Sequence, residues 1–208
     1  MMTLADEIER QTSLFAVATR ADAGSDEEVY QREISRGRNG FFAMSGAFIG
    51  FGRGTSGGPM DLDWYRTQWT QRACYSELRD ADFVFGCDIF ADLLFMREGA
   101  VLRLDGETGD CVRVASSPDA FAAMTLEQAS ELLGGNLARQ CFGGRYLDED
   151  PMRLLPTAPF VTAGGDYHSF LTVPLTVALR RKAVLSQKLV GLPDGAGVDL
   201  TFWHEEIH

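Results

Sequence analysis

The segment from His204 to His208 has the spacing of a zinc-protease motif. It reads His-Glu-Glu-Ile-His, and the H-E-x-x-H pattern binds zinc when a helix places both histidines on one face, with the glutamate as general base. Here the segment follows a predicted strand, and five residues do not form a stable helix by themselves. His168 is the only other histidine in the sequence. We therefore expect no metal site.

A glycine-rich stretch matches the loop that binds the phosphates of dinucleotides. Gly52 to Gly57 reads Gly-Arg-Gly-Thr-Ser-Gly, which fits G-x-G-x-x-G, and it lies between a predicted strand and a predicted helix. A dinucleotide-binding domain also needs alternating strands and helices, which this sequence does not show, and Pro59 intervenes before the helix. The pattern therefore favours a mobile glycine-rich connection, and we expect no nucleotide cofactor.

The same stretch places a serine in the setting of an esterase nucleophile. Gly54 to Gly58 fits G-x-S-x-G, with Ser56 as the nucleophile, Asp148 as a candidate acid and His168 as the base. This arrangement requires a mostly parallel sheet, whereas the strands predicted here are antiparallel. A small serine hydrolase that uses Ser56 therefore stays a remote alternative.

Acids and an aromatic residue cluster before the central strands. Asp61, Asp63, Trp64, Asp80 and Asp82 could together form a binding surface for a protein partner, because aromatic side chains dominate such interfaces and exposed acids attract basic partners. The competing interpretation is that the nearby Trp69 belongs to the core and that the acids form a solvated first helical turn, which the helix dipole favours.

The overall charge excludes one class of function. The chain has 208 residues, with 30 acidic and 19 basic side chains and a formal net charge of −11. Direct nucleic-acid binding is therefore not expected, since contacts to phosphates need lysine and arginine. The charge would steer a basic protein partner, although acidity can also serve solubility alone. Hydrophobic residues make up 45% of the chain, enough for a sizeable core.

The cysteines indicate the compartment. Cys74, Cys87, Cys111 and Cys141 are widely spaced, so the sequence has no CxxC pair and no zinc-ribbon spacing. We interpret them as free thiols. Because the first residues are too charged for a secretory signal and no apolar run is long enough to span a membrane, we expect a cytoplasmic protein without membrane contact.

The elements that must position these residues centre on 82–115. Alternating apolar residues between the turns at Glu98-Gly99 and 105–109 predict an antiparallel meander. The fold class expected is α+β, a mixed and mostly antiparallel sheet covered by helices. We expect one domain over residues 1–208, in which residues 1–36 form a helical N-terminal extension.

The flanking segments carry recognisable start and stop signals. A capping box at Ser25 to Glu28 opens a helix to Ile34, a strand over 41–51 is broken at Ser45-Gly46, and a helix is expected over 61–74. Four elements are predicted after the meander, namely a helix starting near Ser117, a second helix over 125–133, a third helix over 175–189 and a strand over 198–203. On the helix over 175–189 the basic side chains are expected to face mostly outward, and these are Arg180, Arg181, Lys182 and Lys188.

A series of short motifs runs from Gly37 to Trp203. It comprises Gly40-Phe41-Phe42-Ala43 through Phe51; Asp88-Ile89-Phe90-Ala91-Asp92 with Phe95; Leu104 to Gly109; Ser117 to Phe121; Leu154-Leu155-Pro156 with Pro159-Phe160-Val161; Gly164 to Tyr167; and Gly191 to Gly195. In its order and spacing the series resembles the SMI1/KNR4 (SUKH) superfamily. One departure is Ala91, where the resemblance implies a glycine.

The resemblance implies both a fold and a role. Members have a compact α+β domain, and the bacterial ones are mostly immunity proteins that neutralise a neighbouring cell's toxin by binding it. Other members are adaptors or regulators, and the family has no catalytic residues to carry over. We therefore expect a non-enzymatic immunity protein whose partner is a cognate toxin domain, for which a basic nuclease is one candidate. An adaptor that binds an endogenous protein is the alternative.

Overall fold

The fold is built on one antiparallel sheet. The computed structural model describes residues 25–34, 40–53, 58–142, 152–157, 159, 170–193 and 196–204. Six strands pair in the order in which they occur in the chain, each antiparallel to the next. They are β1 (Phe41–Ala43), β2 (Phe48–Gly50), β3 (Phe83–Cys87), β4 (Leu93–Arg97), β5 (Ala100–Leu104) and β6 (Cys111–Ala115). The predicted meander over 82–115 is confirmed.

A second, smaller sheet pairs β7 (Met152–Pro156) with β8 (Phe170–Pro174), also antiparallel. One isolated parallel bridge joins Gly52 to Asp61. With several helices around both sheets, the predicted α+β class is confirmed.

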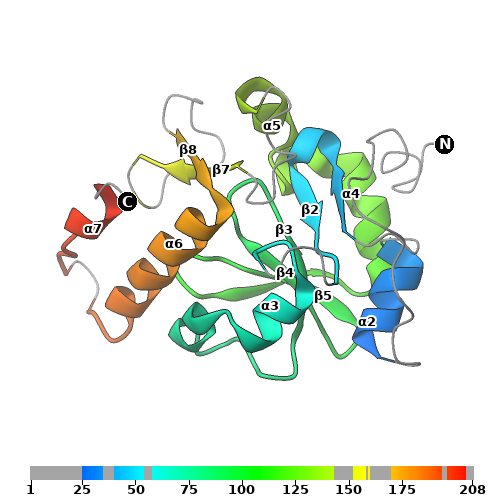
Figure 1. The fold of residues 1–208 in the computed structure, drawn as a ribbon, viewed down its shortest axis with the longest axis horizontal. Helices are drawn as coiled ribbons and strands as arrows, with labels where there is room; N and C mark the ends of the chain where they lie inside the picture. Colours follow the sequence, from blue (N-terminus) through cyan, green and yellow to red (C-terminus); the bar gives the residue numbers. More distant parts are fainter. Residues whose placement is uncertain are drawn as a thin grey trace.

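Helices flank the main sheet on both sides. In Figure 1, α2 and α4 lie on one flank, α6 lies on the opposite flank, and β7 and β8 lie beside the start of α6. The helical segments are α2 (Asp26–Val29), the π-helix η1 (Tyr30–Ile34), the 3-10 turns η2 (Met44–Gly46) and η3 (Thr70–Cys74), α3 (Leu62–Thr67), α4 (Pro118–Leu132), α5 (Gly135–Cys141), α6 (Leu175–Leu189) and α7 (Thr201–His204).

Aromatic rings fill the core between β3 and the helices that cover it. Phe85 lies at the centre, with its ring centroid 5.3 Å from that of Tyr30 and 6.0 Å from that of Phe121. The Tyr30 hydroxyl donates a hydrogen bond of 2.7 Å to the Phe51 carbonyl. The end of the predicted N-terminal extension, residues 25–34, therefore contributes to the central core; residues 1–24 lie outside the described residues.

Several predicted elements differ in their details. The helix expected over 61–74 is divided into α3 and η3 at Trp69. The two helices expected over 117–133 are present within α4, but they meet at a kink at Gln128 and not at Thr125. The strand predicted over 198–203 is wrong, because Thr201 to His204 is helical and the Asp199 carboxylate accepts a hydrogen bond from the Thr201 amide, as at a helix start.

The turn between β3 and β4 joins both sheets to α6. Asp88 Oδ1 accepts hydrogen bonds from the Phe90 and Asp92 amides, which folds residues 88–92 into a tight loop. Within it Ala91 has a φ of 63°, the left-handed region that favours glycine. The Leu154 amide on β7 donates to the Ile89 carbonyl at 2.8 Å. We call residues 88–92 the junction turn.

The junction turn also explains a wrong prediction about α6. Lys182 was expected to face outward, but it is 2% exposed and its ammonium lies 2.6 Å from Asp92 Oδ1. Arg181 was expected outward as well and is 8% exposed. A buried charge is stable where it meets an opposite charge, and the junction turn supplies one for Lys182.

Candidate partner-binding site

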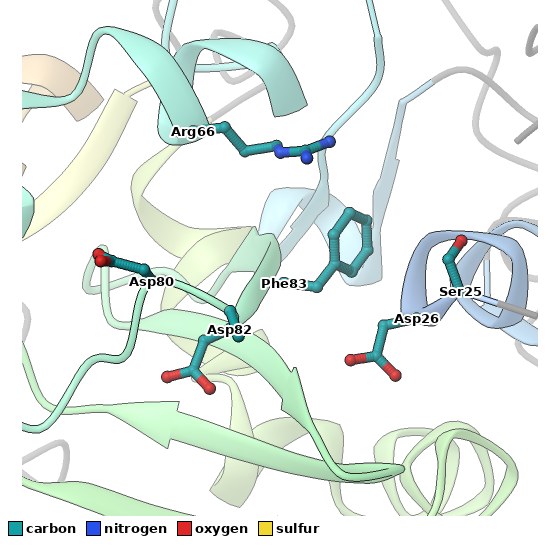
Figure 2. A pocket seen from close by; sticks show the side chains of 7 residues that line it. Ser25, Asp26, Arg66, Asp80, Asp82 and Phe83 are labelled. Atoms are coloured by element: carbon teal, nitrogen blue, oxygen red, sulfur yellow. The ribbon is translucent and has the colours of Figure 1, made fainter. Parts of the chain in front are cut away.

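A hollow of about 260 Å³ opens in the surface where the chain enters the meander. Its walls come from the start of α2, the last turn of α3 and the segment leading into β3. Figure 2 shows the lining side chains, which are Ser25, Asp26, Arg66, Asp80, Ala81, Asp82 and Phe83. Two of the five residues predicted to bind a partner, Asp80 and Asp82, therefore lie in one concave site.

Asp82 is the fixed acid of the hollow. Arg97 on β4 binds both of its oxygens, with Nη2 at 2.6 Å from Oδ2 and Nε at 2.8 Å from Oδ1. The Arg79 amide donates to Oδ2 at 2.7 Å. A two-point pair of this kind sets the orientation of both side chains, and it also holds the pKa of Arg97 above its usual value. Asp82 therefore shapes the site through a carboxylate that is paired with Arg97.

Among the described residues, Asp26 is the acid of the hollow that forms no ion pair with a basic side chain. Burial raises the pKa of its carboxyl, and the nearby charge of Asp82 raises it further. Its position is set by the predicted capping box, since the Glu28 amide donates to Ser25 Oγ at 3.2 Å. A cation placed between Asp26 and Asp82 would relieve the repulsion between these two carboxylates.

Arg66 and Asp80 are the exposed charges at the rim. Arg72 Nε lies 3.9 Å from Asp80 Oδ1, a distance at which a surface pair contributes little. In Figure 2 the Phe83 ring stands between the Arg66 side chain and the two carboxylates of Asp26 and Asp82. The hollow thus offers an aromatic wall with acids on one side and a cation on the other, an arrangement that fits a protein side chain carrying hydrogen-bond donors.

The other predicted interface residues lie on α3. Asp61 is 4% exposed and caps this helix, accepting a hydrogen bond of 2.9 Å from the Asp63 amide. Asp63 is exposed, with Arg53 Nε 3.9 Å from its carboxylate. Trp64 is half-buried and packs edge-on against Tyr65. Of the predicted set, Asp63, Trp64 and Asp80 are therefore accessible to a partner.

The competing interpretation of this region is correct for Trp69. Its side chain is 4% exposed, and its ring lies 5.5 Å from the Tyr65 ring and 5.8 Å from the Tyr75 ring. Trp69 thus belongs to the core. Asp63 is the exposed acid of the first turn of α3, as that interpretation also expects, but the interpretation is wrong for Asp61, which is buried as the cap of the helix.

Sequence reasoning missed five residues of the hollow, namely Ser25, Asp26, Arg66, Ala81 and Phe83. They come from the start of α2, from α3 and from the segment that leads into β3, which lie far apart in the chain. The capping box marked Ser25 as a helix start, but no local pattern indicated that this start would face residues 80–83.

The catalytic-looking motifs receive no structural test. Ser56, Asp148, His168 and the end of the His204–His208 segment lie outside the described residues. Within the ranges that are described, no group of three or more histidine, cysteine, aspartate or glutamate side chains is placed to hold a metal ion.

The four thiols are all free, as predicted. Burial raises the pKa of Cys87 to about 11, against the opposing effect of Arg153. Cys111 also has its pKa raised to about 11, first by burial and then by Glu77. Since the thiolate is the reactive form, neither cysteine is set up as a nucleophile at neutral pH.

Searches for related proteins find none. No family model matches the chain, and neither the curated proteins nor the solved structures give a match. Among the helices that the structure describes, none is both long and apolar enough to cross a membrane.

Proposed function

We propose that this protein is a non-enzymatic, cytoplasmic immunity protein that neutralises a cognate toxin domain by binding it. Two features support the proposal. One is the ordered series of motifs that resembles the SMI1/KNR4 superfamily, whose members have the same α+β fold class as this chain. The other is the net charge of −11, which favours a basic partner such as a nuclease.

The observation that carries the proposal is the hollow at the entry to the meander. It combines the carboxylates of Asp26, Asp80 and Asp82 with the ring of Phe83 in one concave surface. Protein interfaces are anchored by a few side chains that enter such pockets. The accessible residues Asp63 and Trp64 lie on α3, the helix that supplies Arg66 to the wall of the same hollow.

The test is a viability assay with a defined toxin domain. The candidate is the C-terminal domain of any large secreted protein that is encoded beside this gene, and it is expressed with and without this chain. We expect toxicity alone, rescue on co-expression, and a stable complex of the two purified proteins. Toxicity without rescue, or the lack of any toxic neighbour, would contradict the immunity role and favour an adaptor that binds an endogenous protein.

A chemical probe separates the remote hydrolase alternative. A fluorophosphonate that labels an active serine should not react with this chain. Labelling that disappears in Ser56→Ala would overturn the non-enzymatic part of the proposal. The same Ser56→Ala variant should rescue cells from the toxin as well as the unaltered chain does.

A further inference from the structure

Asp88 has a buried carboxyl group, and one of its two oxygens has no hydrogen-bond partner among the described residues. The residue is 0% exposed at the end of β3. Oδ1 is occupied by the Phe90 and Asp92 amides at 2.9 and 3.0 Å. Oδ2 is buried and has no hydrogen-bond donor among the described residues. A carboxylate in this position would keep an unsolvated charge on Oδ2, whereas a carboxylic acid can carry its proton there.

Both acidic and basic groups surround Asp88, and together they disfavour a second negative charge beside Asp92. The groups that face it are Asp92 in the junction turn, Lys182 on α6, Arg103 on β5, Arg153 on β7 and the thiol of Cys87 on β3. The ammonium of Lys182 donates a hydrogen bond to Asp92, and the charge of Glu107 also stabilises its protonated form. The charge of Lys182 is therefore already shared with other carboxylates.

Burial and the neighbouring Asp92 together raise the pKa of Asp88 to about 7, although Lys182 and Arg103 oppose the shift. The ordinary value for aspartate is about 3.9. The folded chain thus holds a proton that the unfolded chain releases. The contribution of Asp88 to the free energy of unfolding is therefore largest below pH ~4. It decreases as the pH rises towards 7 and is lost above that pH.

The position of Asp88 gives this proton a structural effect. Asp88 closes the junction turn, and within that turn the Ile89 carbonyl accepts a hydrogen bond from the Leu154 amide of β7. Asp92 Oδ1 accepts hydrogen bonds from the Gly106 amide and from the Lys182 ammonium of α6. The small sheet, the β5–β6 turn and α6 are all attached to the main sheet at the junction turn.

We propose that Asp88 is a proton-operated latch. Its carboxyl carries a proton on the buried Oδ2 while the turn is closed, and release of that proton to solvent loosens the attachment of β7 and α6 to the main sheet. This inference goes beyond the proposed binding role and does not depend on it, since the junction turn contains none of the residues of the hollow.

The test compares the protein with Asp88→Asn, which keeps an oxygen for the two amides and carries no charge. Urea unfolding is measured from pH 4 to 8. We expect the stability of the variant relative to the unaltered protein to increase from pH 4 to about 7 and to change little above that. An identical pH dependence would overturn the proposal.

Asp105→Asn is the matched control. Asp105 Oδ1 accepts the Glu107 and Thr108 amides in the same kind of turn, at 2.8 and 3.3 Å, but the side chain is half-buried. This variant should follow the pH dependence of the unaltered protein. If it shows the same gain as Asp88→Asn above pH 7, the effect belongs to acidic turns in general and the latch is contradicted.

Two measurements on the unaltered protein remain decisive if Asp88→Asn does not fold. Carbon-13 NMR of the carboxyl groups should show one aspartate that titrates near neutral pH; the absence of any such group would overturn the inference. Amide hydrogen exchange should show the protection factor of Leu154 falling between pH 6 and 8. Constant protection at Leu154 would contradict the loosening.

Discussion

Lys182 Nζ and Asp92 Oδ1 lie 2.6 Å apart, although 90 positions separate the two residues in the sequence. Both side chains are buried, 3% and 13% exposed. Burial by itself lowers the pKa of Lys182, but Asp92, Glu107 and Asp88 raise it above its ordinary value, so the charged form is stabilised. The pair joins α6 to the junction turn.

Replacing Lys182 should therefore destabilise the fold strongly. Lys182→Met removes the cation and leaves Asp92 buried without it, which typically costs about 3–5 kcal/mol. Urea unfolding at pH 7 measures the loss. The same change at Arg180, which is exposed on the same helix, should alter stability by less than about 0.5 kcal/mol. Asp92→Asn combined with Lys182→Met should recover part of the loss, and a double variant as unstable as Lys182→Met would contradict the pairing argument.

Gly86 should tolerate no side chain. An alanine Cβ at this position would lie 2.4 Å from the Ile49 carbonyl oxygen of β2 and 2.7 Å from the Phe48 ring. Because the nearest atom is backbone of a paired strand, β2 would have to move, and Gly86→Ala should cost at least ~1–3 kcal/mol. Gly197→Ala, where nothing lies within 4 Å, is the control and should leave thermal stability almost unchanged. Equal melting temperatures for both variants would show that β2 can shift away from the new side chain without loss of stability.

Trp203 should fix the C-terminal segment to β7. Its side chain is fully buried, and Nε1 donates a hydrogen bond of 2.9 Å to the Pro156 carbonyl. Trp203→Phe removes the donor and leaves unfilled space, with an expected loss of about 1–3 kcal/mol in unfolding free energy. Val190→Ala, at a side chain that is 70% exposed, serves as the neutral comparison. A stable Trp203→Phe protein would mean that the segment contributes little to the fold.

Charge reversal at the rim of the hollow and in the first turn of α3 should weaken binding to the toxin domain. Asp63→Lys and Asp80→Lys change exposed side chains, so folding should be preserved while affinity falls, with the larger loss at low salt. Calorimetry at two salt concentrations measures both effects. Asp110→Lys makes the same charge change at an exposed side chain of the β5–β6 turn, which does not line the hollow, and should weaken binding less. Equal losses in all three variants would place the interface elsewhere.

Much of the fold could be predicted because its signals are local. The meander follows from alternating apolar residues between glycine turns, and α6 begins and ends where its periodicity indicated. The strand predicted over 198–203 failed for a physical reason. Val198, Leu200 and Phe202 alternate as a strand would, but no neighbouring strand pairs with them in the described structure, and Trp203 is the side chain that becomes buried.

The site could be predicted only in part. The acidic composition of 80–82 was visible in the sequence, whereas the residues that make it concave, Asp26 and Phe83 among them, meet only through tertiary packing. The inward position of Lys182 was missed for the same reason. Its partner, Asp92, lies on a turn far away in the sequence, and helical spacing contains no information about that turn.

The consecutive order of β1 to β6 bears on how the chain forms during synthesis. Each strand of the main sheet pairs with the strand made just before it, so the sheet can assemble as far as Ala115 while α6 is still untranslated. At that stage Asp88 and Asp92 have no Lys182, and the end of the sheet to which β7 will attach carries solvated negative charge. We expect this charge to keep the uncovered junction turn in contact with water until the C-terminal half arrives and covers it.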